Sequence, residues 1–216
     1  SLTISVGAVA VGMLVGGALG LLSGFRRGRA DTFLSSLFDI LLAFPPLVLA
    51  LSLVAFLSPP PTNDGGDVTS GGLTSVQILV VAIGIVSIPL LARITRATTL
   101  TWSQREFVTA ARAQGARPLR LMLREVLPNV LPAMFSVALL SIGLAIIAEG
   151  GLSVLGVGVE PPDPSWGNMI AENRSVNRAP LNALFSPMVV VFLTVMALNY
   201  LGDAVRDRFD VRASAL

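Results

Sequence analysis

Long apolar segments alternate with short polar segments along this chain of 216 residues. Five of the apolar segments are long enough to cross about 30 Å of hydrocarbon as a helix. They cover residues 2–23, 32–57, 76–92, 130–148 and 183–201. The pattern predicts an all-α integral membrane protein with five transmembrane helices, folded as a single domain over residues 1–216.

Small residues recur at every fourth position of the first span, where they form one face. They are Ala8, Gly12, Gly16, Gly20 and Gly24. Small residues at this spacing let a second helix approach closely. Glycine is also common in membrane helices generally, but three successive GxxxG steps favour a packing face. The partner helix belongs either to this chain or to another one.

The second span is interrupted near its middle by Pro45 and Pro46. Prolines remove backbone donors, so a kink or an unwound turn is predicted there. In a membrane such a break is tolerated only beside protein or a water-filled cavity. Asp39 lies in the same span. A carboxylate inside the membrane is a functional candidate, and its alternative role is to pair with an arginine near the same face.

A short apolar segment follows the fourth span. Glu149 comes directly after that span, and residues 150–159, which include Ser153, are too few to cross the membrane. This length predicts a re-entrant or interfacial segment. Trp166 follows in a proline-rich turn, and its amphipathic ring suits the boundary between membrane and water. Residues 58–75 are rich in Pro, Gly, Ser and Asp and predict a flexible loop.

An arginine-rich polar segment, residues 106–128, separates the third span from the fourth. Gly115 predicts the end of a first helix over about 105–114, because glycine tolerates positive φ. A second helix is expected to carry an apolar stripe and to place its arginines on a different face. The stripe comprises Leu119, Met122, Leu123 and Val126, and the arginines are Arg117, Arg120 and Arg124. Such a pair is either a docking element or a loop whose arginines only set the topology.

The positive charges mark one side of the membrane. All 15 basic residues are arginines, and 13 of them lie in the turn at 25–31, in the segment 93–125 and in the tail from residue 202. The other two, Arg174 and Arg178, lie in the loop at 150–182, and the loop at 58–75 has none. By the positive-inside rule the first group is cytoplasmic and the two loops are external. The N-terminus is then outside. Because no signal precedes the first span, we infer a further segment upstream, such as an earlier span.

The composition of the chain indicates a membrane protein and excludes several kinds of functional site. Hydrophobic residues make up 53% of the chain and charged residues 13%, against about 25% charged in soluble domains. The chain has no Cys, His or Lys, which excludes disulfides, Cys/His metal sites, histidine bases and a phosphate-binding loop with its lysine. The pI of 10.3 follows from the topology and does not indicate a nucleic-acid partner.

Four stretches, which together cover nearly the whole chain, resemble one family. The arginine-rich segment resembles the "EAA" pattern of bacterial ABC importer permeases: Glu-Ala-Ala, three residues, Gly, nine residues, an apolar residue, one residue and Leu-Pro. The matching residues are Ala110, Ala111, Gly115, Leu127 and Pro128. The stretches DILLAFP from Asp39, EGGLSVLGVGVEPPDPSWGNM from Glu149 and NYLGDAVRDRFD from Asn199 are similar to the dipeptide/oligopeptide/nickel group, nearest to its second, C-type permease.

The chain departs from the family pattern at several places. Thr109 stands where the Glu of the EAA pattern is usual, and Glu125 stands where a hydrophobic residue or His is usual. The loop at 58–75 is longer than typical, and the family's first helix, which starts in the cytoplasm, is missing. The change at Thr109 removes a charge from the first short helix but leaves its small and apolar residues.

The resemblance implies an importer permease in the bacterial inner membrane, with the arginine-rich loop and the C-terminus in the cytoplasm. A second permease subunit would complete the pathway for di- or oligopeptides, and an extracytoplasmic solute-binding protein would deliver them. Two ATPase subunits would bind ATP and Mg²⁺, so this chain would need no cofactor or metal of its own and would not be an enzyme.

The resemblance assigns one group of site residues, and the residues within and next to the spans suggest a second group. Coupling to the ATPases would involve the loop at about 102–128. Its residues are Arg105, Glu106, Thr109, Ala110, Ala111, Arg112, Gly115, Arg120, Leu127 and Pro128. The candidates for the translocation path are Asp39, Pro45, Pro46, Glu149 and Ser153. Glu149 would either attract the amino terminus of a peptide or form a structural pair.

Two other functions compete with a peptide permease. A membrane-embedded enzyme such as an intramembrane protease would need paired carboxylates or a nucleophile with its base, whereas Asp39 and Glu149 are expected near opposite membrane faces. A permease of the same architecture for nickel or another small solute is the closer alternative. The chain offers no soft metal ligand, but the binding protein could make that selection.

Overall fold

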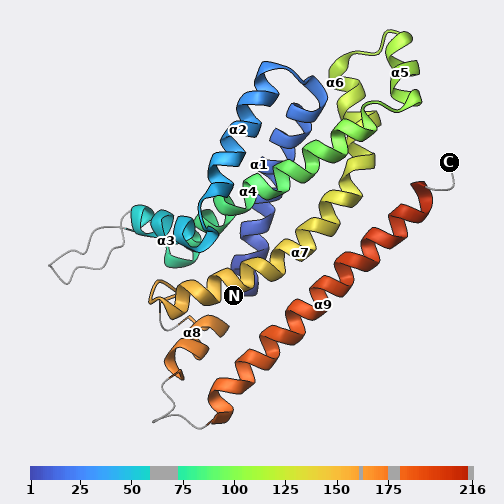
Figure 1. Ribbon diagram of the computed structural model, residues 1–216. Helices are drawn as coiled ribbons and strands as arrows, with labels where there is room; N and C mark the ends of the chain where they lie inside the picture. Colours follow the sequence, from blue (N-terminus) through green and yellow to red (C-terminus); the bar gives the residue numbers. More distant parts are fainter. Residues whose placement is uncertain (59–72, 161–162, 175–180, 214–216) are drawn as a thin grey trace.

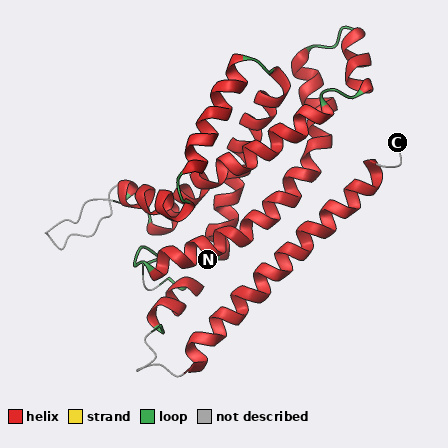
Figure 2. Cartoon of the chain, in the orientation of Figure 1, coloured by secondary structure: helices red, strands yellow, loops and turns green. Residues whose placement is uncertain are grey.

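The computed structural model describes residues 1–58, 73–160, 163–174 and 181–213, and every regular element in these ranges is helical (Figure 2). In chain order the helices are α1 (Leu2–Arg26), α2 (Arg29–Ala43), α3 (Pro46–Leu57), α4 (Ser75–Trp102), α5 (Glu106–Ala113), α6 (Pro118–Arg120), the π-helix η1 (Leu121–Val126), α7 (Leu127–Val154), α8 (Trp166–Glu172) and α9 (Leu181–Ala213). The prediction of an all-α chain is confirmed. Most of the loop predicted at 58–75 lies outside the described residues.

Helices α1 and α4 run side by side and pack against each other more extensively than any other two described helices (Figure 1). A Cβ atom on Gly16 would lie 2.6 Å from the Ile88 carbonyl oxygen, and one on Gly20 would lie 2.3 Å from the Ala92 carbonyl oxygen. Only glycine permits this backbone contact. The small-residue face is therefore a packing face, as predicted, and its partner is in the same chain.

The second predicted span is two helices. Helix α2 ends at Ala43, α3 begins at Pro46, and their axes meet at 94°. Phe44 has extended backbone angles, as expected for a residue that precedes a proline. The predicted break at Pro45 and Pro46 is confirmed, and the bend is large enough that α3 does not continue the direction of α2 (Figure 1).

The fourth predicted span is longer than its apolar residues suggest. Segments α6, η1 and α7 form one 37-residue helical span from Pro118 to Val154, so the second short helix of the arginine-rich segment is not separate. The prediction of a re-entrant or interfacial segment at 150–159 is wrong for its first half, because residues 150–154 extend α7. Helix α7 ends at Val154, and Gly156, two residues later, has a φ of +84°. The Val157 amide donates to the Leu152 carbonyl oxygen at 2.9 Å, which completes a glycine-terminated helix cap.

Helix α9 lies along α7 at one side of the bundle, and α8 packs across the end of α7 (Figure 1). Ser136 of α7 donates a hydrogen bond to the Gly202 carbonyl oxygen of α9 at 2.8 Å. Four helices of the described chain are long and apolar enough to cross a membrane, and the bent pair α2–α3 makes five if it counts as one span. This agrees with the five predicted spans.

Candidate functional site

Helix α5 projects from one end of the bundle, and aromatic contacts hold its first residues. Arg105 precedes α5, and its guanidinium carbon lies 5.4 Å from the centre of the Trp102 ring at the end of α4. The Trp102 and Phe107 rings lie 6.3 Å apart. A cation over an indole face and a tilted aromatic pair are both favourable contacts. They fix the direction in which the chain leaves α4.

The two faces of α5 differ in what they contact. Val108 is fully buried in a cluster with Leu121 and Val126, and Ala111 packs against the same cluster. Glu106, Thr109, Ala110 and Arg112 are exposed, and of these Glu106 and Ala110 lie on the face opposite Val108. The helix is therefore anchored to the rest of the chain on one side and open to a partner on the other.

Gly115 ends α5 as predicted. Its φ is +83°, a left-handed conformation that favours glycine. The Ala116 amide donates to the Ala111 carbonyl oxygen at 3.2 Å, and the Gly115 amide donates to the Arg112 carbonyl oxygen at 3.0 Å. These two bonds form a Schellman cap, after which Pro118 opens the next helix.

The apolar stripe predicted for the second helix is wrong in part. Met122 and Val126 are buried, but Leu119 is 62% exposed and Leu123 is 46% exposed, and the fully buried Leu121 was not predicted. Residues 121–126 form a π-helix, in which hydrogen bonds join residues five apart and the side-chain period is wider. A wider turn here also relieves the clash between the ring of Pro128 and the preceding turn.

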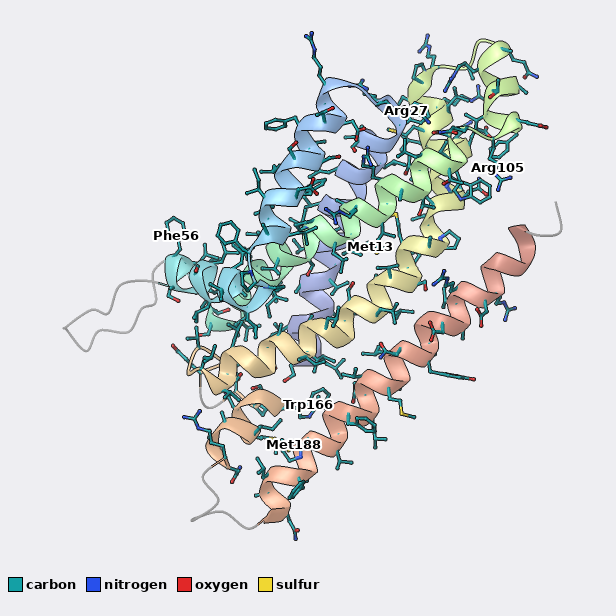
Figure 3. All side chains as sticks on the ribbon, in the orientation of Figure 1. Met13, Arg27, Phe56, Arg105, Trp166 and Met188 are labelled. Carbon is teal, nitrogen blue, oxygen red and sulfur yellow. The ribbon has the colours of Figure 1, made fainter. Side chains whose placement is uncertain are left out.

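The remaining coupling candidates surround this buried cluster. Leu127 packs against it, whereas Pro128 is exposed at the start of α7. Arginines are exposed on α5 and on the segments around it, and none of them forms an ion pair with a described residue. They are Arg105, Arg112, Arg117, Arg120 and Arg124. Arg27 of the α1–α2 turn lies at the same end of the bundle, and Trp166 and Met188 lie at the other end (Figure 3).

The path candidate Asp39 is paired with an arginine. The Arg93 guanidinium of α4 donates to an oxygen of Asp39 on α2, and both side chains are more than half exposed. A second ion pair joins the same two helices, because Arg96 binds Asp31 through Nε at 2.5 Å and Nη2 at 2.8 Å. Pairing with an arginine near the same face was the alternative role predicted for Asp39, and this contact confirms it, although the sequence did not single out Arg93. The helix α4 continues past both arginines to Trp102.

The other path candidates lie toward the far end of the bundle. Pro45 and Pro46 are exposed at the α2–α3 break. Glu149 is fully buried inside the isolated chain, and Ser153 donates to its Oε1 at 3.4 Å. The structure therefore does not place Glu149 on a surface where a second subunit could form a path. A cavity of about 410 Å³ opens between α7 and α8, and Ser153 lines it.

Solved structures of ABC transporters contain chains with this arrangement of helices. The chain aligns with an inward-facing structure of the MetNI methionine ABC transporter with a TM-score of 0.77 and 18% sequence identity, over 95% of this chain and 91% of the other. It aligns with an amino acid ABC transporter with a TM-score of 0.63 and 19% identity, over 96% and 89% of the two chains. At these identities the likeness shows the fold.

The sequence itself shows the family. Residues 16–215 match the model of the binding-protein-dependent transport system inner membrane component, and the chain belongs to that family. It is 40% identical over 210 residues to the di/tripeptide transport system permease protein DppC of Pseudomonas aeruginosa, and 38% identical over 211 residues to the glutathione transport system permease protein GsiD of Pectobacterium atrosepticum. The match covers 97% of this chain in both cases, but the chain spans only 64% and 65% of those relatives.

Proposed function

We propose that this chain is a permease subunit of an ABC importer and that it forms half of the translocation path for di- or oligopeptides. The observation that carries the proposal is α5, a short helix anchored on one face and open on the other, between two long apolar helices of a chain of this family. The names of the peptide and glutathione permeases among its relatives support the choice of cargo.

In this proposal α5 sits in a groove of an ATPase subunit and transmits the movement of that subunit to the bundle. Its buried Val108 contacts Leu121 and Val126, which lead directly into α7, and the Trp102–Arg105 contact connects it to the end of α4. A displacement of α5 would therefore move two long helices as rigid bodies. ATP and Mg²⁺ would be bound by two partner ATPases.

The arginine distribution supports an orientation in the bacterial inner membrane. The end that carries α5 and the α1–α2 turn would be cytoplasmic, together with the C-terminus, and the end that carries α8 would be external. A second permease subunit would complete the path, and an external solute-binding protein would deliver cargo to the α8 end. The alternative is the same assembly with nickel or another small solute. Uptake of a labelled dipeptide and of labelled nickel by the whole complex separates the two.

The docking role of α5 is tested by co-purification with the ATPase subunits. Ala110 is exposed, whereas Ala111 packs against the chain itself, so Ala110→Glu changes the docking face without disturbing the internal cluster. Ala30→Glu is the matched control, because Ala30 is exposed at the start of α2, at the same end of the bundle. We expect Ala110→Glu to lose most of the bound ATPase and Ala30→Glu to retain it. If both variants retain the ATPase, α5 is not the docking element.

A further inference from the structure

The side chains of the Asp39–Arg93 ion pair are largely exposed on this chain, although both residues lie in apolar segments. The side chain of Arg93 is 57% exposed and that of Asp39 is 63% exposed. Neither forms another hydrogen bond with a described residue. One carboxylate oxygen and most of the guanidinium N–H groups are therefore available to a ligand.

The neighbouring ion pair, Asp31–Arg96, is a structural contact and serves as a comparison. Asp31 is only 13% exposed and Arg96 31% exposed. Asp31 receives two bonds from Arg96 and one from Ser23 of α1 at 2.6 Å. This contact joins α1, α2 and α4 and leaves few free groups. The Asp39–Arg93 pair has neither this coverage nor a contact with a third helix.

The position of the Asp39–Arg93 pair favours protein or water over lipid beside it. Charged side chains within a membrane face protein or a water-filled cavity, because exposure to acyl chains is costly. The α2–α3 break begins five residues after Asp39, and it is exposed on this chain from Leu42 to Val48. A broken helix is likewise tolerated only beside protein or water. Two independent features of α2 thus indicate that protein or water, rather than lipid, lies along it.

We propose that Asp39 and Arg93 form a site in the translocation path that binds the two charged ends of a short peptide. The free oxygen of Asp39 accepts hydrogen bonds from the peptide ammonium group, and the free N–H groups of Arg93 donate to its carboxylate. Exposed ion pairs contribute little to stability, so the pair opens at small cost when a zwitterionic cargo arrives. This inference rests on the proposed permease function and names the chemistry that the path recognises.

The first test compares transport by the complete complex in lipid vesicles with external binding protein and internal ATP. The variant is D39N/R93Q, which removes both charges and keeps groups that can hydrogen-bond to each other. We expect the number of dipeptides transported per ATP hydrolysed to fall at least tenfold, with the thermal stability of the complex unchanged. The matched double variant D31N/R96Q at the covered pair is expected to lower thermal stability. Transport per ATP by D39N/R93Q equal to wild type overturns the inference.

The second test asks whether the pair faces water in the assembled complex. The chain has no cysteine, so Asp39→Cys gives this subunit a single thiol, whose modification by a small, charged thiosulfonate reagent is read on this subunit alone. Ser5→Cys is the buried control, since Ser5 is 0% exposed. We expect the thiol of the Asp39→Cys variant to be modified and a loaded binding protein with ATP to slow the modification. A thiol that stays unmodified with and without nucleotide means that the second permease covers the pair, and the inference is wrong. If the wild-type complex moves no peptide with ATP, the proposed function fails instead.

Discussion

Gly20 illustrates how single residues determine the packing of this bundle. A Cβ atom there would meet the Ala92 carbonyl oxygen at 2.3 Å, so Gly20→Ala forces α1 away from the backbone of α4. Overpacking of this kind costs roughly 1–3 kcal/mol, and we expect a lower unfolding temperature for the purified complex. Gly7→Ala is the matched control on the same helix, because its Cβ would lie 3.4 Å from the Val80 methyl groups. Equal destabilisation by both variants would contradict this account.

Some residue-level roles follow from the sequence and others do not. The spacing of glycines along α1 predicted a packing face, because the signal is local and repeats. The burial of Glu149 could not be predicted in this way. Its carboxylate follows an apolar span as a solvated helix end would, and only the packing of the surrounding helices covers it. The sequence did predict pairing with an arginine as one role of Asp39, but the identity of the partner, Arg93, depends on how α2 lies against α4.

At the scale of elements, the sequence predicted the ends of the helices more accurately than the faces that the helices bury. Gly115 predicted the end of α5, because positive φ is a property of one residue. The apolar stripe after it assumed a period of about 3.6 residues, and the π-helix at 121–126 changed that period. Similarly, the two prolines predicted a break but not its angle of 94°, and α3 packs against α4 and α7, which are far from it in sequence.

The end of α5 yields a prediction about that element. A residue with a side chain at Gly115 must adopt a φ of +83°, which costs roughly 1–2 kcal/mol for most residues and less for Asn. Hydrogen exchange of the amides at 106–114 is therefore expected to accelerate in Gly115→Val and to change little in Gly115→Asn. No atom lies within 4 Å of the added Cβ, so a clash does not confound the comparison. Equal exchange in the two variants would show that the cap does not hold α5.

At the scale of the whole molecule, the sequence predicted the number and order of the spans but not their neighbours. Helices α1 and α4 pack closely although the broken pair α2–α3 separates them in sequence. Helix α9 buries little of itself within this chain, with 6% of its apolar window covered. The sequence could not predict this, because the hydropathy of α9 is similar to that of the other spans. Only the fold of the chain determines which helix keeps an uncovered face.

The orientation of the molecule gives a prediction at this scale. Exposed arginines gather at the end with α5 and the α1–α2 turn, whereas α8 lies at the other end (Figure 3). Positive charge is retained on the cytoplasmic side. In intact cells a membrane-impermeant thiol reagent should therefore modify Glu172→Cys in α8 and not Gln104→Cys between α4 and α5, and both positions are exposed. After the cells are permeabilised, Gln104→Cys should react as well. The reverse labelling would place the arginine-rich end outside, and α5 could then not contact a cytoplasmic ATPase.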